Sequence, residues 1–442
     1  MKATAKNRLL SVVTSVALIA IVALGSRLAF AWDQERQIPR NVLEIVPFQN
    51  ETANIASSLT QGKGFGSVFR QETGPTAWLT PVYPVLVGAI FRIFGIFSIA
   101  SFFAIVFMNS LFSAAACVPI FFAGKRIGGI GIASTAAWLW AVFPSAVVIP
   151  FEWVWDTSLS ALLGATLLWA TLELAESQRL SDWCTYGLLW GLALLTNPAL
   201  ASLLPFLLGW ATYRAMRAGH LKIARPALAA AIAVLCCLPW TIRNYVVFHR
   251  IIPLRSNLPF ELWLGNNDIF DEQAHNGKQR ITRYEEVRRY SKLGETAFMD
   301  EKWRLATQFV NEHPALEMRL TGRRFVAMWM GTEHPLKDFL ETDSLLARVA
   351  FATNSFAAMG TIAGIFVLWW RRSAFAFPAS VFPVVFPMVY YVTHASLRYR
   401  HAIDPVVLLL TAIALHALTQ TVARCMPSHK TLSKRARTDA HP

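Results

Sequence analysis

Long apolar runs recur along this chain of 442 residues, and they limit what it can fold into more than any other feature. Hydrophobic residues make up 55% of the chain and charged residues 15%, and the mean hydropathy is +0.41. This is too apolar for a soluble domain and indicates a protein with several membrane spans. Because backbone inside a bilayer must satisfy its own hydrogen bonds, and the runs do not alternate with polar residues, we expect an all-α polytopic fold.

We predict about ten transmembrane helices within one transmembrane domain, residues 1–425, followed by a basic, disordered cytoplasmic tail, residues 426–442. Asn197-Pro198 breaks the chain between the fifth and sixth spans. The predicted spans are residues 9–31, 99–123, 127–149, 157–175, 183–196, 199–213, 226–242, 346–370, 375–393 and 402–422.

The first predicted span also has features of a secretory signal. Lys2, Lys6 and Arg8 precede an apolar stretch, and residues 29–31 have the A-x-A form of a cleavage site. The apolar stretch is longer than a signal core. We therefore interpret it as an uncleaved first span.

The segment at residues 81–97 is apolar enough to be ambiguous, and charge decides its placement. If it does not cross and the N-terminus is cytoplasmic, the Lys/Arg clusters near residues 125, 214–225 and 371 and the basic tail all lie inside. If it crosses, all of them lie outside. The positive-inside rule therefore predicts an interfacial or re-entrant helix. Two large extracytoplasmic loops result, residues 32–98 and 243–344, and the second contains an amphipathic helix near residues 295–312.

The net charge of +14 has two readings, nucleic-acid binding and membrane topology. Most Lys and Arg residues flank apolar runs or lie in one hydrophilic loop, which is typical of topology signals and argues against nucleic acid. The five cysteines include no CxxC pair, so we expect neither a disulfide framework nor a zinc site. No P-loop, GxSxG, HExxH or Rossmann pattern occurs.

Three carboxylates on the outer side are candidates for catalysis. Glu51 opens a short amphipathic pattern in the first loop, while Glu152 and Asp156 lie between the third and fourth spans and would share a face if that stretch were helical. One acid could deprotonate an acceptor hydroxyl while another orients it or holds a cation. For Asp156 the structural alternative is a helix N-cap. With no His/Cys cluster, any metal at Glu51 and Asp156 is expected to be Mg²⁺ or Mn²⁺.

Three arginines on the same side are candidates for binding a phosphate. Arg243 follows the seventh span beside aromatic residues, and Arg398 and Arg400 form a cationic cluster with His401 before the last span. A guanidinium fork suits a phosphate, and outer cations facing acids suit an anionic lipid headgroup. The alternative for Arg243 is snorkelling toward headgroups.

These segments together resemble the GT-C class of polyprenol-phosphate-sugar-dependent glycosyltransferases, in particular bacterial glycosyltransferase family 39 and dolichyl-phosphate-mannose-transferase-like members. The resemblance covers most of residues 1–422 and depends on the order and spacing of degenerate motifs. The stretches that carry it are ASSLTQGKGF, GPTAWLTPVYPVLVGAIFRIFG, VWDTSLSALL, GLLWGLALLTNPAL, PWTIRNYVVF, LWLGNN and YRHAIDPVVLLL.

The resemblance implies an inverting enzyme of the bacterial inner membrane, and the charge pattern predicts that both termini are cytoplasmic. The enzyme would move a sugar from a polyprenyl-phosphate donor to a lipid-linked glycan, polysaccharide or protein hydroxyl at the outer face. It implies Glu51 as base or metal partner, Asp156 with Glu152 as the second acidic position, and Arg243, Arg398 and Arg400 as phosphate ligands. Many relatives have two neighbouring acids in the first loop, whereas here Thr52 follows Glu51. The alternatives are a non-catalytic transporter or scaffold for lipid-linked sugars and an inactive transferase.

Overall fold

The structure is a computed structural model that describes residues 14–425, except 153, 220–221, 268–278, 333–341 and 343. The predicted tail at residues 426–442 and the beginning of the first predicted span lie outside the described residues. Within them, regular structure is helical apart from one isolated β-bridge between Gly66 and Pro75. The expected all-α fold is confirmed.

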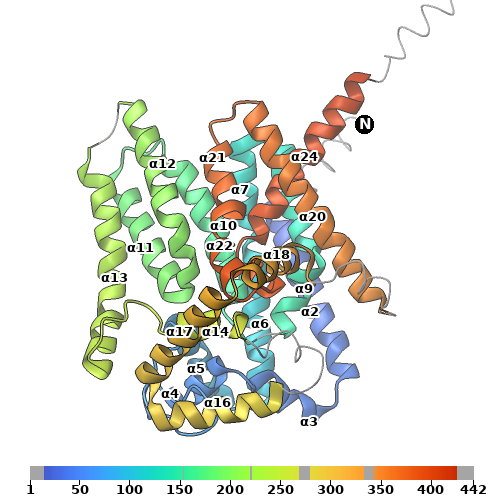
Figure 1. Ribbon diagram of the computed structural model, residues 1–442. Coiled ribbons are helices and arrows are strands. Elements are labelled where there is room, and N and C mark those ends of the chain that lie inside the picture. Colours follow the sequence, from blue (N-terminus) through green and yellow to red (C-terminus); the bar gives the residue numbers. More distant parts are fainter. Residues whose placement is uncertain are drawn as a thin grey trace, which may run out of the picture.

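Long helices run side by side in a bundle, and shorter helices gather at one end of it, which we call the loop end (Figure 1). By length and composition, six helices of the described chain could cross a membrane, and a pair bent by 43° would make a seventh. The six are α2 (Val16–Gln37), α6 (Ile99–Ala115) joined to α7 (Cys117–Gly128), α10 (Thr157–Leu174), α13 (Ala224–Phe248), α20 (Leu345–Trp370) and α24 (Asp404–Cys425), and the bent pair is α8 (Ile130–Val142) with α9 (Pro144–Glu152).

The other three predicted spans coincide with shorter helices, because prolines interrupt the backbone hydrogen bonding there. Pro198 begins a 3₁₀ helix between the fifth and sixth predicted spans, and Pro387 separates the two pieces of the ninth. These elements are α11 (Leu180–Thr196), η2 (Pro198–Leu203), α12 (Leu204–Arg217), α21 (Ala376–Val385) and α22 (Met388–Val392).

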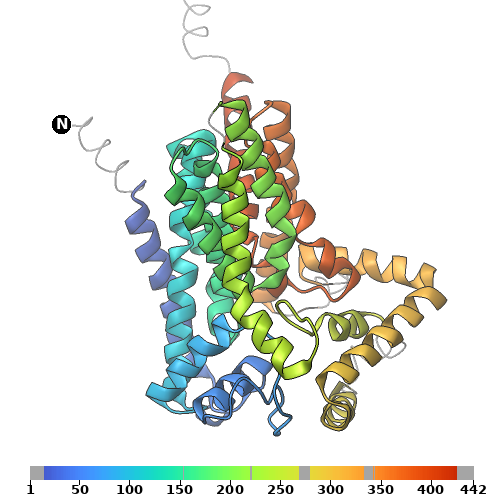
Figure 2. The same ribbon diagram turned by 90° about the vertical axis from the view of Figure 1, so that its left-hand side faces the viewer.

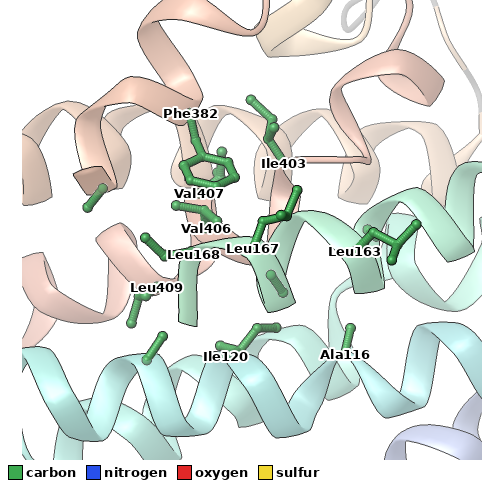
Figure 3. Close-up of a cluster of buried hydrophobic side chains, with 14 of the residues drawn as sticks. Ala116, Ile120, Leu163, Leu167, Leu168, Phe382, Ile403, Val406, Val407 and Leu409 are labelled. Atoms are coloured by element: carbon green, nitrogen blue, oxygen red, sulfur yellow. The ribbon is translucent and has the colours of Figure 1, made fainter. Parts of the chain in front are cut away.

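The main apolar core lies in the middle of the bundle, around α10. Figure 3 shows Leu163 and Leu167 of α10 between the small side chain of Ala116 on one side and Val406 of α24 on the other. Phe382 of α21 covers the same cluster. All of these side chains are buried, so the helices that carry them are fixed relative to one another.

Helices α20 and α24 approach each other closely because glycines face the contact. A Cβ atom added at Gly364 would lie 2.1 Å from the carbonyl oxygen of Leu410, and one at Gly360 would lie 2.5 Å from the Thr411 side chain. Small residues at a crossing allow backbones to pack directly, as in many membrane helix pairs.

The loop end contains helices from both large loops, and α16 to α18 project to one side of the bundle (Figure 2). Helix α17 covers the residues predicted for an amphipathic helix. Helix α5 has 13 residues and so is about 20 Å long, shorter than the ~30 Å hydrocarbon core. The elements here are α3 (Arg40–Leu43), η1 (Val46–Phe48), α4 (Glu51–Thr60), α5 (Val82–Phe94), α14 (Leu258–Gly265), α16 (Gln279–Leu293), α17 (Glu295–Glu312), α18 (Pro314–Met330) and α23 (Leu397–Arg400).

Candidate active site

A cavity of about 1110 Å³ lies where the loop end meets the long helices. Its volume slightly exceeds the range of about 300–1,000 Å³ that is usual for small-molecule sites. Both large loops, the α9–α10 connection and the segment before α24 contribute to its wall. The acidic, basic and histidine side chains in its lining are Glu51, Glu152, Asp156, Arg255, Glu261, Glu286, His394 and Arg398.

Glu51 is the first residue of α4, and its backbone is fixed by a cap. The preceding Asn50 accepts a hydrogen bond from the Ala53 N–H (2.9 Å), which starts the helix at Glu51. An acidic side chain in the first turn interacts favourably with the dipole of the helix. In the described part of the chain no hydrogen bond or ion pair engages the Glu51 carboxylate, which leaves its oxygens available in the cavity.

Asp156 lies directly before α10 but does not cap it. Its carboxylate instead accepts a hydrogen bond from the Ser160 hydroxyl (2.8 Å), and Ser160 in turn accepts one from the Asn197 amide (3.2 Å). Burial raises the pKa of Asp156, an effect opposed by the Ser160 hydrogen bond and by Arg255 and Arg398. A carboxylate with a raised pKa beside cations in a cavity is typical of functional sites.

Glu152 also lines the cavity, at the end of α9, and its side chain is exposed. The structure does not place it on one helical face with Asp156, because α9 ends at Glu152 and α10 begins only at Thr157. The two acids therefore reach the cavity from different helix ends.

Glu261 is a fourth carboxylate, which the sequence interpretation missed. It lies in the otherwise apolar helix α14, where the Asn257 side chain donates to it (3.1 Å). Burial raises its pKa, Arg255 opposes that effect, and the neighbouring charge of Glu51 adds to it. A lone acid within LPFELWLG is the signal that could have identified it, since such an acid is costly to bury without a function.

Two arginines line the cavity, and both act electrostatically on Asp156 and Glu261. Arg398 donates to the Tyr399 hydroxyl (3.0 Å) and lies over the Trp155 ring, 4.6 Å from its centre. Arg255, which the sequence interpretation also missed, makes no hydrogen bond or ion pair with the described residues. Guanidinium groups in such a cavity suit a phosphate.

The structure does not bring the other two predicted phosphate ligands to the cavity lining of the described chain. Arg243 donates to the carbonyl oxygens of Thr76 and Phe65, both at 2.7 Å. Arg400 is fully buried and forms an ion pair with Asp404 (2.6 Å). Both guanidinium groups are thus used in contacts that hold the fold.

His394 lines the cavity near Arg398, in the connection between α22 and α23. Burial lowers its pKa to about 4, and the charges of Arg398 and Arg324 add to that effect. The imidazole is therefore neutral at pH 7, so it does not add a third positive charge beside the arginines.

Aromatic side chains form much of the remaining wall. Trp78 contacts Phe260 with ring centres 5.0 Å apart, and Tyr390 stacks on Tyr399 at 4.7 Å. Such faces, combined with a few charged groups, suit a ligand that has both apolar faces and polar edges, as a sugar ring does.

The predicted metal ligands Glu51 and Asp156 both line the cavity. Among the described residues, however, no three His, Cys, Asp or Glu side chains come close enough together to hold a metal ion. Arginines lie among the cavity carboxylates and compete for them. The described residues therefore do not fit a metal site built from three side chains.

Comparisons with known proteins agree with the resemblance. Residues 79–242, fewer than half of the chain, match the sequence model of the dolichyl-phosphate-mannose-protein mannosyltransferase family. No curated protein matches the chain.

Among the solved structures that match are several of an oligosaccharyltransferase from Archaeoglobus fulgidus. The apo form has a TM-score of 0.52 at 13% identity, and the match covers 97% of this chain and 52% of that one. The complex with Zn and sulfate has a TM-score of 0.50 at 12% identity, covering 92% and 49%. The chain thus spans about half the length of these structures, and a likeness at such low identity concerns the fold. The resemblance is confirmed: the chain has the GT-C fold of membrane glycosyltransferases, and its residues 79–242 carry the pattern of the mannosyltransferase family.

Proposed function

We propose that the chain is an inverting glycosyltransferase of the bacterial inner membrane, with a polyprenyl-phosphate sugar as donor. The acceptor would be a hydroxyl of a cell-envelope glycan, lipid or protein at the outer face. The observation that supports this most is the combination, in one cavity at the loop end, of carboxylates with two arginines. The GT-C fold and the family match over residues 79–242 support the same reaction class.

Glu51 is the proposed base, because its carboxylate lies in the cavity free of other bonds within the described chain. Asp156, oriented by Ser160, would accept a hydrogen bond from the acceptor hydroxyl and hold it in line. As the acceptor oxygen bonds to the anomeric carbon, the bond from that carbon to the phosphate oxygen breaks, and the hydroxyl proton passes to Glu51.

The leaving group is polyprenyl phosphate, which gains negative charge as the bond breaks. Arg255 and Arg398 are the proposed ligands of that phosphate, in place of Arg243 and Arg400, since they are the arginines that line the cavity of the described chain. Fixed positive charge aimed at the place where negative charge develops stabilises the transition state more than the ground state.

The test is transfer by purified protein from a panel of radiolabelled polyprenyl-phosphate sugars to an envelope extract. A positioned base contributes roughly 10²–10⁴ in rate, so Glu51→Gln is expected to lower turnover by about that factor. Glu44→Gln is the matched control, since Glu44 lies in the same loop, is exposed and does not line the cavity.

Normal turnover by Glu51→Gln would reject Glu51 as the base. A folded wild type that binds polyprenyl-phosphate sugars but transfers none of them would favour the transporter alternative. The labelled product, if formed, identifies the acceptor.

A further inference from the structure

Glu295, the first residue of α17, is a buried carboxylate outside the cavity lining that joins the two large loops. It accepts hydrogen bonds from the Ala77 N–H (2.8 Å) and from the hydroxyls of Ser256 (2.6 Å), Tyr290 (2.7 Å) and Thr76. Its donors therefore come from the first loop, from the chain after α13 and from α16. Four donors from three separate segments thus converge on one side chain.

Two further hydrogen bonds fix the backbone on both sides of Arg255. The Leu254 carbonyl accepts a hydrogen bond from the Trp240 indole (2.6 Å), and the Ser256 N–H donates to the Ala77 carbonyl (2.8 Å). Arg255 itself is held by no hydrogen bond or ion pair within the described chain. Its position in the cavity thus depends on its neighbours.

Arg243 also contacts the first loop, next to the segment that binds Glu295. Its guanidinium donates to the carbonyls of Thr76 and Phe65, and the charge of Glu295 acts on it electrostatically. We refer to Glu295, Arg243, Thr76, Ala77 and Ser256 as the clasp.

We propose that Glu295 is a positioning residue that acts through Ser256 to hold Arg255 in place for the donor phosphate. This inference rests on the proposed function. A guanidinium whose backbone is already ordered loses less entropy on binding a phosphate, so the clasp increases affinity without touching the ligand. Asp156 and Glu261 lie within electrostatic reach of Arg255 and balance its charge before the donor arrives.

The test measures the Kd for polyprenyl phosphate of the wild type, Glu295→Gln, Arg255→Gln and the double variant. Each single variant is expected to weaken binding about tenfold, the effect of losing or misplacing one charged hydrogen bond. If Glu295 acts through Arg255, the double variant binds no more weakly than Arg255→Gln alone. Glu312→Gln is the matched control, because Glu312 is exposed at the other end of α17.

Amide hydrogen exchange gives a second readout that needs no activity. In Glu295→Gln, the peptides containing Ala77 and Ser256 are expected to exchange faster, whereas Glu312→Gln leaves them unchanged. Additive losses of affinity in the double variant, or unchanged exchange in Glu295→Gln, would overturn the inference. A wild type that binds no polyprenyl phosphate would overturn the proposed function, and the exchange data would still decide whether Glu295 orders these segments.

Discussion

Arg398 and Arg400 are two residues apart, and the structure predicts opposite consequences for their replacement. Arg400 is fully buried, where it pairs with Asp404 and donates to the Asn354 amide oxygen (2.6 Å) and the Trp329 carbonyl (2.7 Å). In Arg400→Met the carboxylate of Asp404 loses its cation in an apolar environment. Breaking a buried pair in this way costs about 3–5 kcal/mol.

This cost can be expressed as a melting temperature. At an average unfolding entropy of ~2.1 cal/mol/K per residue, a chain of 442 residues has about 0.9 kcal/mol/K in total, so Arg400→Met is expected to lower Tm by about 3–5 °C. Arg400→Met combined with Asp404→Leu removes both charges and is expected to recover part of that loss.

Arg398→Met is the matched comparison. We expect it to leave Tm nearly unchanged and to raise the Kd for polyprenyl phosphate by roughly 10- to 150-fold, the equivalent of a charged hydrogen bond worth about 1.5–3 kcal/mol. Thermal unfolding in detergent and binding of polyprenyl phosphate measure the two effects. An Arg400→Met protein with native Tm and weakened phosphate binding would refute the reasoning.

Two further predictions concern Asp156 and Gly265. Burial raises the pKa of Asp156 above its ordinary 3.8, so the folded state binds the carboxyl proton more tightly than the unfolded state does. The contribution of Asp156 to the free energy of unfolding therefore falls as pH rises from about 3.8 through the pKa of the folded state. Asp156→Asn is therefore expected to raise Tm at pH 7 relative to wild type, with no difference below about pH 3.8, and to lower turnover; a lower Tm at pH 7 would contradict this. A Cβ added at Gly265 would lie 1.7 Å from the Thr393 carbonyl oxygen, so Gly265→Ala is expected to displace α14 and reduce both Tm and activity. Gly209, whose added Cβ meets nothing within 4 Å, provides the control: Gly209→Ala should be neutral or stabilising by up to ~1 kcal/mol, and equal Tm values for the two variants would count against the packing argument.

The fold followed from the sequence because apolar runs that must satisfy their backbone hydrogen bonds leave few alternatives to helices. The sequence also allowed four cavity residues to be identified, because each lies near a helix end on one side of the bundle. These are Glu51, Glu152, Asp156 and Arg398.

Side-chain partners were harder to predict, because they depend on which distant segment packs nearby. Arg243 is next to aromatic residues, as a headgroup-binding arginine would be, yet its partners are carbonyls more than 160 positions away in the first loop. Arg255 and Glu261 had no distinguishing motif of their own. Their place at the cavity depends on how their segments pack against the rest of the chain.

The origin of the cavity residues along the chain has a consequence for biogenesis. Glu51 belongs to the first loop to emerge during synthesis, whereas Arg398 precedes the last long helix, α24, which packs on α8, α10 and α20. A nascent chain that stops before α23 has all the cavity carboxylates of the described chain but lacks Arg398, one of the two arginines that line the cavity. Under the proposed function, a chain stalled before α23 is therefore expected to leave the lipid-linked donor unused.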